Sequence, residues 1–125
     1  MGPKKKAAED GEDLSCEKFF IKYKKNCQAI EQPICKLIKE YYEKEYLEEG
    51  NNISKFHIWE PIGWQGVKAL MEALKSVNYQ HTKSIRLWKT QCEDEGVRAV
   101  CNYIMTCDSV LVIELINNMI TPLGC

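Results

Sequence analysis

The 125-residue sequence has no run of 18 apolar residues and no apolar segment near its N-terminus. The first absence argues against a membrane-spanning helix, and the second predicts a chain without a secretory signal. An excess of one charge is missing as well, because 17 basic and 18 acidic residues leave a net charge of −1. No global field attracts nucleic acid or an anionic membrane. We therefore expect a cytoplasmic chain without nucleic-acid or membrane partners.

Motifs of catalysis and metal binding are also missing. The sequence contains no GxSxG, P-loop, GxGxxG or HExxH motif. Its seven cysteines form no CxxC pair, and His57 and His81 have no ligand spacing, so we expect no metal, no cofactor and no enzyme. The cysteines are interpreted as reduced thiols, most of them small core residues. The alternative is a thiol site at Cys101 and Cys107, which would need a positioned histidine.

The first 13 residues, MGPKKKAAEDGED, carry a lysine run and an acidic cluster but no apolar face. Such a composition buries too little apolar surface to fold, so residues 1–13 are predicted to be a disordered charged tail. Two interpretations of Lys4–Lys6 stay open: a docking or targeting tag, or a solvated run without a partner.

Residues 14–52 show the periodicity of two amphipathic helices joined by a tight turn near Glu31. The apolar positions are Phe19, Phe20, Tyr23, Cys27 and Ile30 in the first helix, and Ile34, Leu37, Ile38, Tyr41, Tyr42 and Leu47 in the second. Ser15 is a candidate N-cap, Pro33 fits the first turn of the second helix, and Gly50 ends it. The surface is dense in Lys and Glu, which indicates either a partner-binding face or a salt-bridged face toward solvent.

From residue 53 to residue 125 the sequence repeats itself. Phe56, Ile85 and Ile113 align at spacings of 29 and 28 residues, and Ile58, Leu87 and Leu115 align two residues further on. Apolar residues two apart place both side chains on one face of a short strand. The segment 53–125 therefore predicts about two and a half strand–helix units, which bury their apolar faces only by stacking.

A glycine precedes the helix expected in each unit. The apolar helix positions are Val67, Leu70, Met71 and Leu74 in the first unit, and Val97, Val100, Cys101 and Ile104 in the second. Gly66, Gly96 and Gly124 are expected to start the helices, where a missing side chain allows a tight entry or a close approach. The acidic run Glu93–Glu95 could bind a cation, but the positive end of the helix dipole explains it without one.

These features resemble a leucine-rich repeat of the long, ribonuclease-inhibitor-like class. That class has the core motif LxLxxN or LxLxxC, followed by an apolar residue and then by a glycine before the helix. The third unit fits best, with Ile113, Leu115, Asn118, Ile120 and Gly124 at the motif positions. At the asparagine position the second unit has Thr90, with Cys92 in the next apolar slot, and the first unit has Pro61.

The resemblance implies an α/β fold: a leucine-rich-repeat solenoid of short parallel strands and helices, with the helical hairpin as its N-terminal cap. In this family the asparagine amide bonds to backbone groups of the turn and links neighbouring units in a ladder. Pro61 would break that ladder, and Thr90 would complete it less fully.

The third unit reaches only the entrance of its helix at Cys125, so its strand is expected to present an open edge. Natural arrays cap such edges, because open apolar edges are prone to aggregation. We therefore expect either the N-terminal part of a longer array or an edge that a partner protein covers.

Strand alternation places His57, Trp59, Arg86, Trp88, Glu114 and Ile116 on the face opposite the apolar pairs. In the repeat family that face lines the concave surface of the solenoid. Tryptophan and arginine are frequent hot spots of protein interfaces, so these six residues are the predicted protein-binding site. The alternative is that Trp59 and Trp88 pack onto neighbouring turns. Trp64 is expected to be core or cap packing.

The expected function is a non-enzymatic protein–protein interaction scaffold with partners at the strand face and at the open C-terminal edge. The MGPKKK start, the Tyr- and Lys-rich helices and the IRLW strand resemble leucine-rich-repeat subunits of ciliary and sperm-flagellar axonemes. This resemblance implies a structural subunit of a hetero-complex in a cilium or flagellum. The alternatives are a regulator of an enzyme, an innate-immune-type ligand-binding repeat domain, and a subunit whose charged helices bind a filament or a coiled coil while the repeats stay passive.

Overall fold

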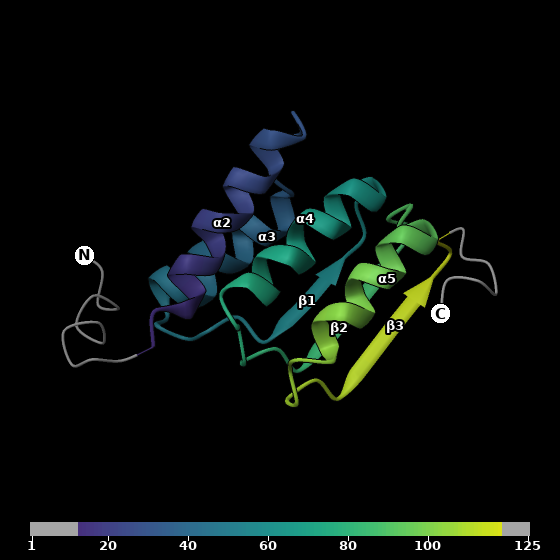
Figure 1. Ribbon diagram of the computed structural model, residues 1–125. Helices are drawn as coiled ribbons and strands as arrows, with labels where there is room; N and C mark the ends of the chain where they lie inside the picture. Colours follow the sequence, from purple (N-terminus) through teal and green to yellow (C-terminus); the bar gives the residue numbers. More distant parts are fainter. Residues whose placement is uncertain (1–12, 119–125) are drawn as a thin grey trace.

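The structure is a computed structural model that describes residues 13–118 (Figure 1). Its elements follow the chain in the order α2 (Ser15–Ala29), α3 (Lys36–Tyr41), η1 (Tyr42–Glu48), β1 (Lys55–Ile58), α4 (Gly63–Ser76), β2 (Ser84–Trp88), α5 (Glu93–Ile104) and β3 (Val112–Ile116). The element η1 is a π-helix that continues α3. The fold is α/β, as predicted. Except for Asp13, the predicted tail lies outside the described residues, as does the predicted helix entrance near Gly124.

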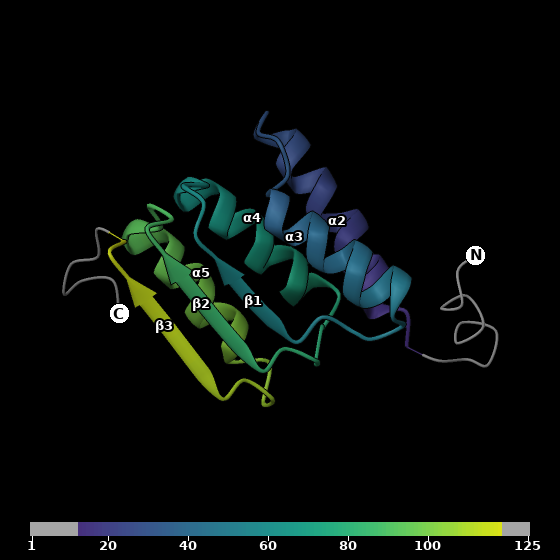
Figure 2. The same cartoon turned by 180° about the vertical axis from the view of Figure 1, so that it is seen from behind.

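The three strands form one open parallel sheet in the order β1-β2-β3. The register pairs Phe56 with Ile85 and Ile85 with Ile113, and two residues further on it pairs Ile58, Leu87 and Leu115. This is the alignment predicted from the sequence. In Figures 1 and 2 the helices α4 and α5 lie side by side across one face of the sheet, with α2 beyond α4.

The core lies between the sheet and this helix layer. Phe56 is fully buried on β1, and Phe19 of α2 meets it edge-on with 5.7 Å between the ring centroids. Two buried tyrosines keep their hydroxyls satisfied by backbone carbonyls: Tyr79 donates to Ile53 at 2.6 Å, and Tyr103 donates to Tyr79 at 2.8 Å. The first bond joins two loops, and the second joins α5 to the loop after α4. The tyrosines therefore hold these loops in place while their rings fill the core.

The helices α4 and α5 begin three residues before the glycine that was expected to start each of them. Their first residues are Gly63 and Glu93, which have positive φ angles of 76° and 57°. The N–H of Gly63 donates to the carbonyl of Thr90, and the N–H of Glu93 donates to the carbonyl of Asn118, both at 2.8 Å. Each helix start is therefore fixed by the turn that follows the next strand, which the local sequence pattern does not reveal.

The glycines at positions 66 and 96 serve close approach rather than helix entry. A Cβ atom on Gly66 would lie 2.6 Å from Nε2 of Gln32 and 2.8 Å from Cβ of Ile62. A Cβ atom on Gly96 would lie 2.9 Å from Sγ of Cys92. Contacts below 3.0 Å require neighbouring atoms to shift, so glycine lets both helices pack tightly at their first turn.

Two predictions for the helical hairpin are wrong in detail. Ser15 is the first residue of α2 rather than its N-cap, and its N–H donates to Oδ1 of Asp13 at 2.7 Å. The second helix begins at Lys36 rather than near Pro33. Gly50 has φ 74° and follows the end of η1, as predicted.

The late start of α3 has a tertiary cause. The carboxylate of Glu60, in the loop after β1, accepts the Cys35 thiol at 2.7 Å and the Leu37 N–H at 3.3 Å. Burial first, and then the Glu60 carboxylate, raise the pKa of the Cys35 thiol to about 12, so the thiol keeps the proton that it donates. Because an acidic side chain near a helix N-terminus is favourable, Glu60 caps α3 from the sheet side.

Asn118 links the turns after β2 and β3. Its Oδ1 accepts the backbone N–H of Thr90 at 2.7 Å and the Thr90 hydroxyl at 2.6 Å. Its Nδ2 donates to the carbonyls of Leu87 at 2.6 Å and Ile116 at 2.9 Å. The side chain is 2% exposed. The side-chain amide therefore bonds to the turn after β2 and to the ends of β2 and β3. This is the bonding expected for the asparagine position of the repeat motif.

Asn118→Ala should lower the free energy of unfolding by about 2 kcal/mol, because it leaves the buried Thr90 N–H and Leu87 carbonyl without these partners. Asn102→Ala is the matched control, since Asn102 is exposed on α5. Urea unfolding followed by circular dichroism measures both. Equal stability of the two variants would contradict the role of the Asn118 link.

Register partners on β2 and β3 differ in burial. Ile85 is fully buried, whereas Ile113, its neighbour on the edge strand, is 38% exposed. Ile85→Ala should therefore lower the free energy of unfolding by about 3 kcal/mol, and Ile113→Ala by about 1 kcal/mol. The same denaturation experiment compares them. A larger loss for Ile113→Ala would mean that this residue is covered in solution.

Candidate functional site

No helix of the described chain lies across β2 and β3 on the sheet face opposite α4 and α5 (Figure 2). The register sets the side chains of that face in three rows that cross the strands. The rows are Lys55, Ser84 and Val112; His57, Arg86 and Glu114; and Trp59, Trp88 and Ile116. Trp59 directly follows β1 and continues its alternation. We call this surface the sheet face; its second and third rows contain all six predicted site residues.

The third row is apolar and open to solvent. Trp59 is 53% exposed and Ile116 is 48% exposed. The rings of Trp59 and Trp88 stack on each other, with 6.3 Å between centroids and 26° between planes. Neither interpretation of the tryptophans is complete, because they pack against each other while one of them stays largely exposed. The result is a preformed aromatic surface that costs little side-chain entropy to order.

The second row is a polar network. Arg86 Nη1 lies 3.4 Å from Oε2 of Glu114, and Nε1 of Trp88 donates to Oε1 of the same carboxylate at 3.2 Å. His57 Nε2 lies 2.7 Å from the Ser84 hydroxyl. Glu114 thus ties the charged row to the tryptophan row, which holds both in one orientation.

A pocket of about 310 Å³ lies beside this network, between β1 and the helical hairpin. It is lined by Tyr41, Glu45, Ile53, Ser54, Lys55 and His57. The hydroxyl of Tyr41 donates to the carbonyl of His57 at 2.5 Å, which fixes the hairpin against β1. Sequence reasoning missed this pocket, because Tyr41 and Glu45 reach it only through the docking of α3 and η1.

The charges on the sheet face change the pKa of His57. Desolvation lowers the pKa of His57 below its usual value of 6.5, and the positive charges of Arg86 and then Lys55 lower it further. The carboxylate of Glu114 acts in the opposite direction. His57 is therefore neutral at pH 7, with one ring nitrogen able to accept a hydrogen bond.

The thiol alternative concerned Cys101 and Cys107. Cys107 is buried, with Sγ 3.2 Å from the Ser109 hydroxyl and 3.5 Å from the Tyr103 hydroxyl. Burial raises the pKa of this thiol, but hydrogen bonds with the side chains of Ser109 and Tyr103 and with the backbone of Ser109 and Thr82 outweigh it and leave the pKa below the usual value. His57 bonds to Ser84 and His81 bonds to Asp13, so the described hydrogen bonds place neither imidazole on this thiol.

The remaining candidates have structural contacts. His81 Nε2 lies 2.6 Å from Oδ2 of Asp13, which joins the start of α2 to the loop before β2. Trp64 is half-buried in the first turn of α4, at the edge of a pocket between α2 and α4. Six cysteines of the described chain carry free thiols. Within residues 13–118, no cluster of three His, Cys, Asp or Glu side chains could hold a metal ion. Over the same range, no helix is both long enough and apolar enough to cross a bilayer.

Comparison with known proteins adds no identity to this geometry. No family model matches the chain, and no curated protein matches it. What the sheet face can bind therefore follows from its own side chains and their arrangement.

The lowered pKa of His57 gives a test of this electrostatic arrangement. The folded chain binds the His57 proton less readily than the unfolded chain, so stability falls as the pH drops through 6.5 toward the lower folded-state pKa. As the pH drops from about 7.5 to about 5, the free energy of unfolding should fall less for His57→Gln than for the wild type. Urea unfolding at each pH measures this difference.

NMR titration of the His57 ring measures its pKa directly. Arg86→Gln should raise that pKa, because it removes the positive charge that lowers it most. Lys36→Gln on α3 is the control and should leave it unchanged. A His57 pKa above 6.5 in the wild type would contradict the arrangement described.

Proposed function

We propose that this chain is a non-enzymatic protein–protein interaction module that binds a partner through the sheet face. The observation that carries the proposal is the row of Trp59, Trp88 and Ile116, held beside a charged row in one rigid sheet. Large apolar side chains set beside fixed charges are typical of interface hot spots, because they bury area at low entropic cost.

Strand spacing favours a helical partner segment. Neighbouring strands lie about 4.8 Å apart, so the three positions of the third row span roughly 10 Å. A helix with apolar residues at i, i+3 and i+7 places them at about 0, 4.5 and 10.5 Å along its axis. One such helix lying across the strands would place one apolar side chain over each position of the row.

We further propose that the fold is a leucine-rich-repeat solenoid with the hairpin α2–α3–η1 as its cap. The in-register strands, the helix that follows each of β1 and β2, and the Asn118 link support this assignment. The edge strand β3 is then a second contact, where a partner would cover the exposed Ile113. A structural subunit of a ciliary or flagellar hetero-complex is the biological setting that we propose. An epitope-tagged chain in ciliated cells tests it: retention in detergent-extracted axonemes supports the setting, and complete release counts against it.

Trp59→Ala combined with Trp88→Ala should weaken partner binding at least tenfold, since each change removes about 1–2 kcal/mol of an aromatic hot spot. Trp64→Phe is the matched control, because Trp64 lies in the helix layer. Affinity capture with quantitative mass spectrometry identifies proteins that the double variant loses and the control keeps.

One such protein, once purified, should protect the backbone amides of β1, β2 and β3 from hydrogen exchange. Full binding by the double variant, or protection confined to the helices, would refute binding through the sheet face. Circular dichroism of each variant separates lost binding from lost folding.

A further inference from the structure

The helices α2 and α4 enclose a second surface on the opposite side of the molecule (Figure 1). Nδ2 of Asn26 on α2 donates to the carbonyl of Ala69 on α4 at 3.0 Å, which sets the spacing of the two helices. Beside this bond lies a pocket of about 300 Å³, whose lining includes Ala29, Ile30, Trp64 and Ala69. We call it the α2–α4 groove. Ile30 is 37% exposed, so an apolar side chain from outside can reach its wall.

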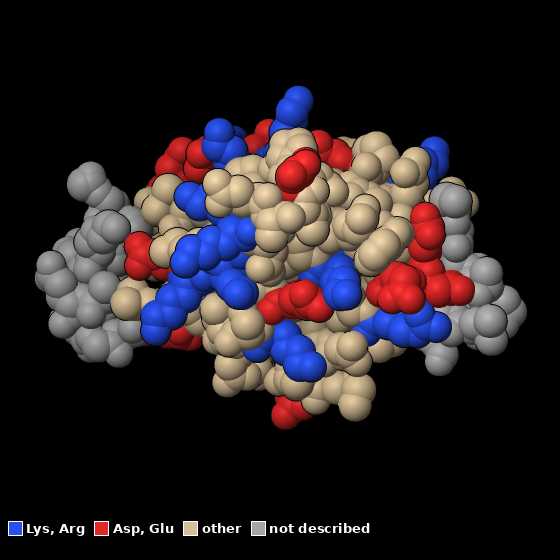
Figure 3. Space-filling model, turned by 45° about the horizontal axis from the view of Figure 1, so that its top comes forward, with Lys and Arg blue, Asp and Glu red and all other residues tan. Residues whose placement is uncertain are grey.

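Lysines lie along α2 beside the groove. Lys22 and Lys25 stand one helical turn before Asn26 and Ala29, which line the groove, and Lys18 stands one turn before Lys22. Lys24 lies on another face of α2, and Glu17 is the one acid of this helix. Within residues 13–118, Lys18, Lys22 and Lys25 form no ion pair, and Lys24 lies over the Phe20 ring at 5.2 Å. Figure 3 shows blue side chains gathered over α2 on this side of the molecule. The helix layer therefore carries uncompensated positive charge although the whole chain is nearly neutral.

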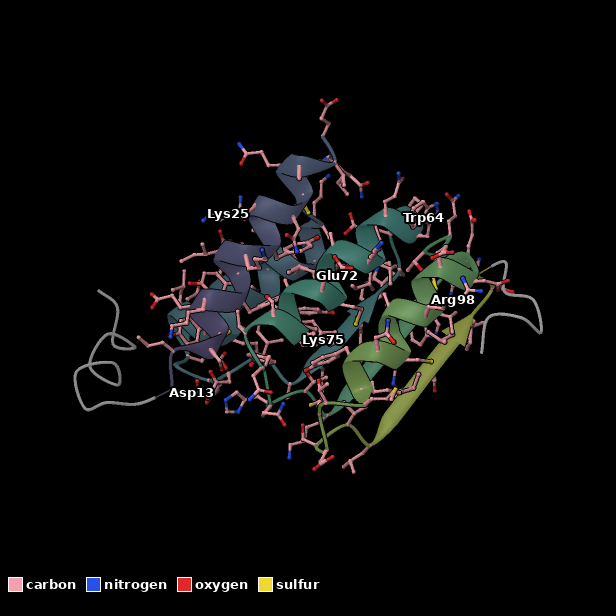
Figure 4. The ribbon with its side chains drawn as sticks, in the orientation of Figure 1. Asp13, Lys25, Trp64, Glu72, Lys75 and Arg98 are labelled. Carbon is pink, nitrogen blue, oxygen red and sulfur yellow. The ribbon has the colours of Figure 1, made fainter. Side chains whose placement is uncertain are left out.

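The carboxylate that lines the groove is already paired. Glu72 lies 3.9 Å from Lys68, and both residues belong to the part of α4 that lines the groove. Figure 4 shows Lys25 on α2, Trp64 at the start of α4, and Glu72 and Lys75 further along that helix. Lys75 lies on the other side of α4, in a hollow that it shares with Glu95 and Arg98 of α5. The groove thus has an apolar end at Trp64 and positive charge along its α2 flank.

We propose that the α2–α4 groove binds an acidic amphipathic helix of a partner protein. A third helix packs naturally into the groove between two neighbouring helices, and the small side chains of Ala29 and Ala69 allow a close approach. Its apolar stripe would meet Ile30 and Trp64, and its carboxylates would meet Lys22 and Lys25. This combination of an apolar wall and a basic flank distinguishes a protein helix from a plain polyanion.

The acidic element η1 of a second copy offers charge but no exposed apolar stripe. The acidic residues Glu43, Glu45 and Glu48 lie on η1, but Tyr42 and Tyr46 on that element are buried. Self-association through these groups would leave Ile30 and Trp64 uncovered, so the structure favours a different protein. Because the groove and the sheet face lie on opposite sides of the sheet, both could be occupied at once.

The test uses the full chain with Trp59→Phe and Trp88→Phe, which leaves Trp64 as the sole tryptophan. The probe is a synthetic amphipathic helical peptide with a leucine stripe flanked by glutamates. One control peptide carries lysines in place of the glutamates, and another carries serines in place of the leucines. We expect a blue shift of Trp64 emission with the acidic leucine peptide alone, and weaker binding as the ionic strength rises.

Lys22→Glu combined with Lys25→Glu should weaken this binding about tenfold. Lys36→Glu combined with Lys44→Glu makes the same change in net charge on α3 and η1 and should leave binding unchanged. Circular dichroism checks that both variants fold.

Three outcomes overturn the proposal. One is an unchanged Trp64 emission with every peptide. The second is equal binding of the serine peptide, which would assign the lysines to polyanions such as nucleic acid. The third is self-association of the wild-type chain that Lys22→Glu with Lys25→Glu abolishes, which would assign the groove to a second copy. The reporter lacks both sheet-face tryptophans, so the two peptide results are independent of partner binding there.

Discussion

The parallel register of β1, β2 and β3 is the constraint on which the rest of the structure depends. It stacks Phe56, Ile85 and Ile113 on one face, and the same alternation sets the tryptophans on the other. The register continues past the strands, because the backbone carbonyls of Thr90 and Asn118 accept hydrogen bonds from the first residues of α4 and α5. A slip of one residue would turn the core face outward and would misplace both helix starts. The fold and the arrangement of the sheet face are therefore set by one set of hydrogen bonds.

Most of the strand pattern could be predicted from the sequence, because alternation is a property of neighbouring residues. The sheet-face residues followed from it, and the structure brings them together. The predicted starts of α3 and α4 were wrong because each depends on a partner far away in the sequence. Glu60 lies 25 residues from Cys35, whose thiol donates to it. Thr90, whose carbonyl accepts the Gly63 N–H, is separated from Gly63 by the whole of α4. The pocket beside His57 was missed for the same reason, since the hairpin must dock before Tyr41 can line it. Local periodicity carries no information on such contacts.

The two sides of the molecule differ in chemistry. On the sheet face, Arg86 pairs with Glu114, so the tryptophan row lies beside a charge that is already compensated. On the helix layer, the lysines of α2 have no such compensation within the described chain. Association with the sheet face should depend little on salt, whereas association with the α2–α4 groove should depend on it strongly. A chain close to zero net charge can thus offer one apolar and one electrostatic surface.

The capping of α3 by Glu60 has a consequence for communication through the molecule. Glu60 follows Trp59 directly in the chain, and its carboxylate holds Cys35 and Leu37 at the first turn of α3. A ligand that displaced Trp59 would strain this cap, and a ligand that reordered the hairpin would in turn change the affinity at Trp59. Thermodynamic linkage makes the two effects equal in free energy. The loop after β1 thus connects the tryptophan row of the sheet directly to the first turn of α3. The flexibility of this loop would decide whether the sheet and the hairpin respond to a ligand independently or together.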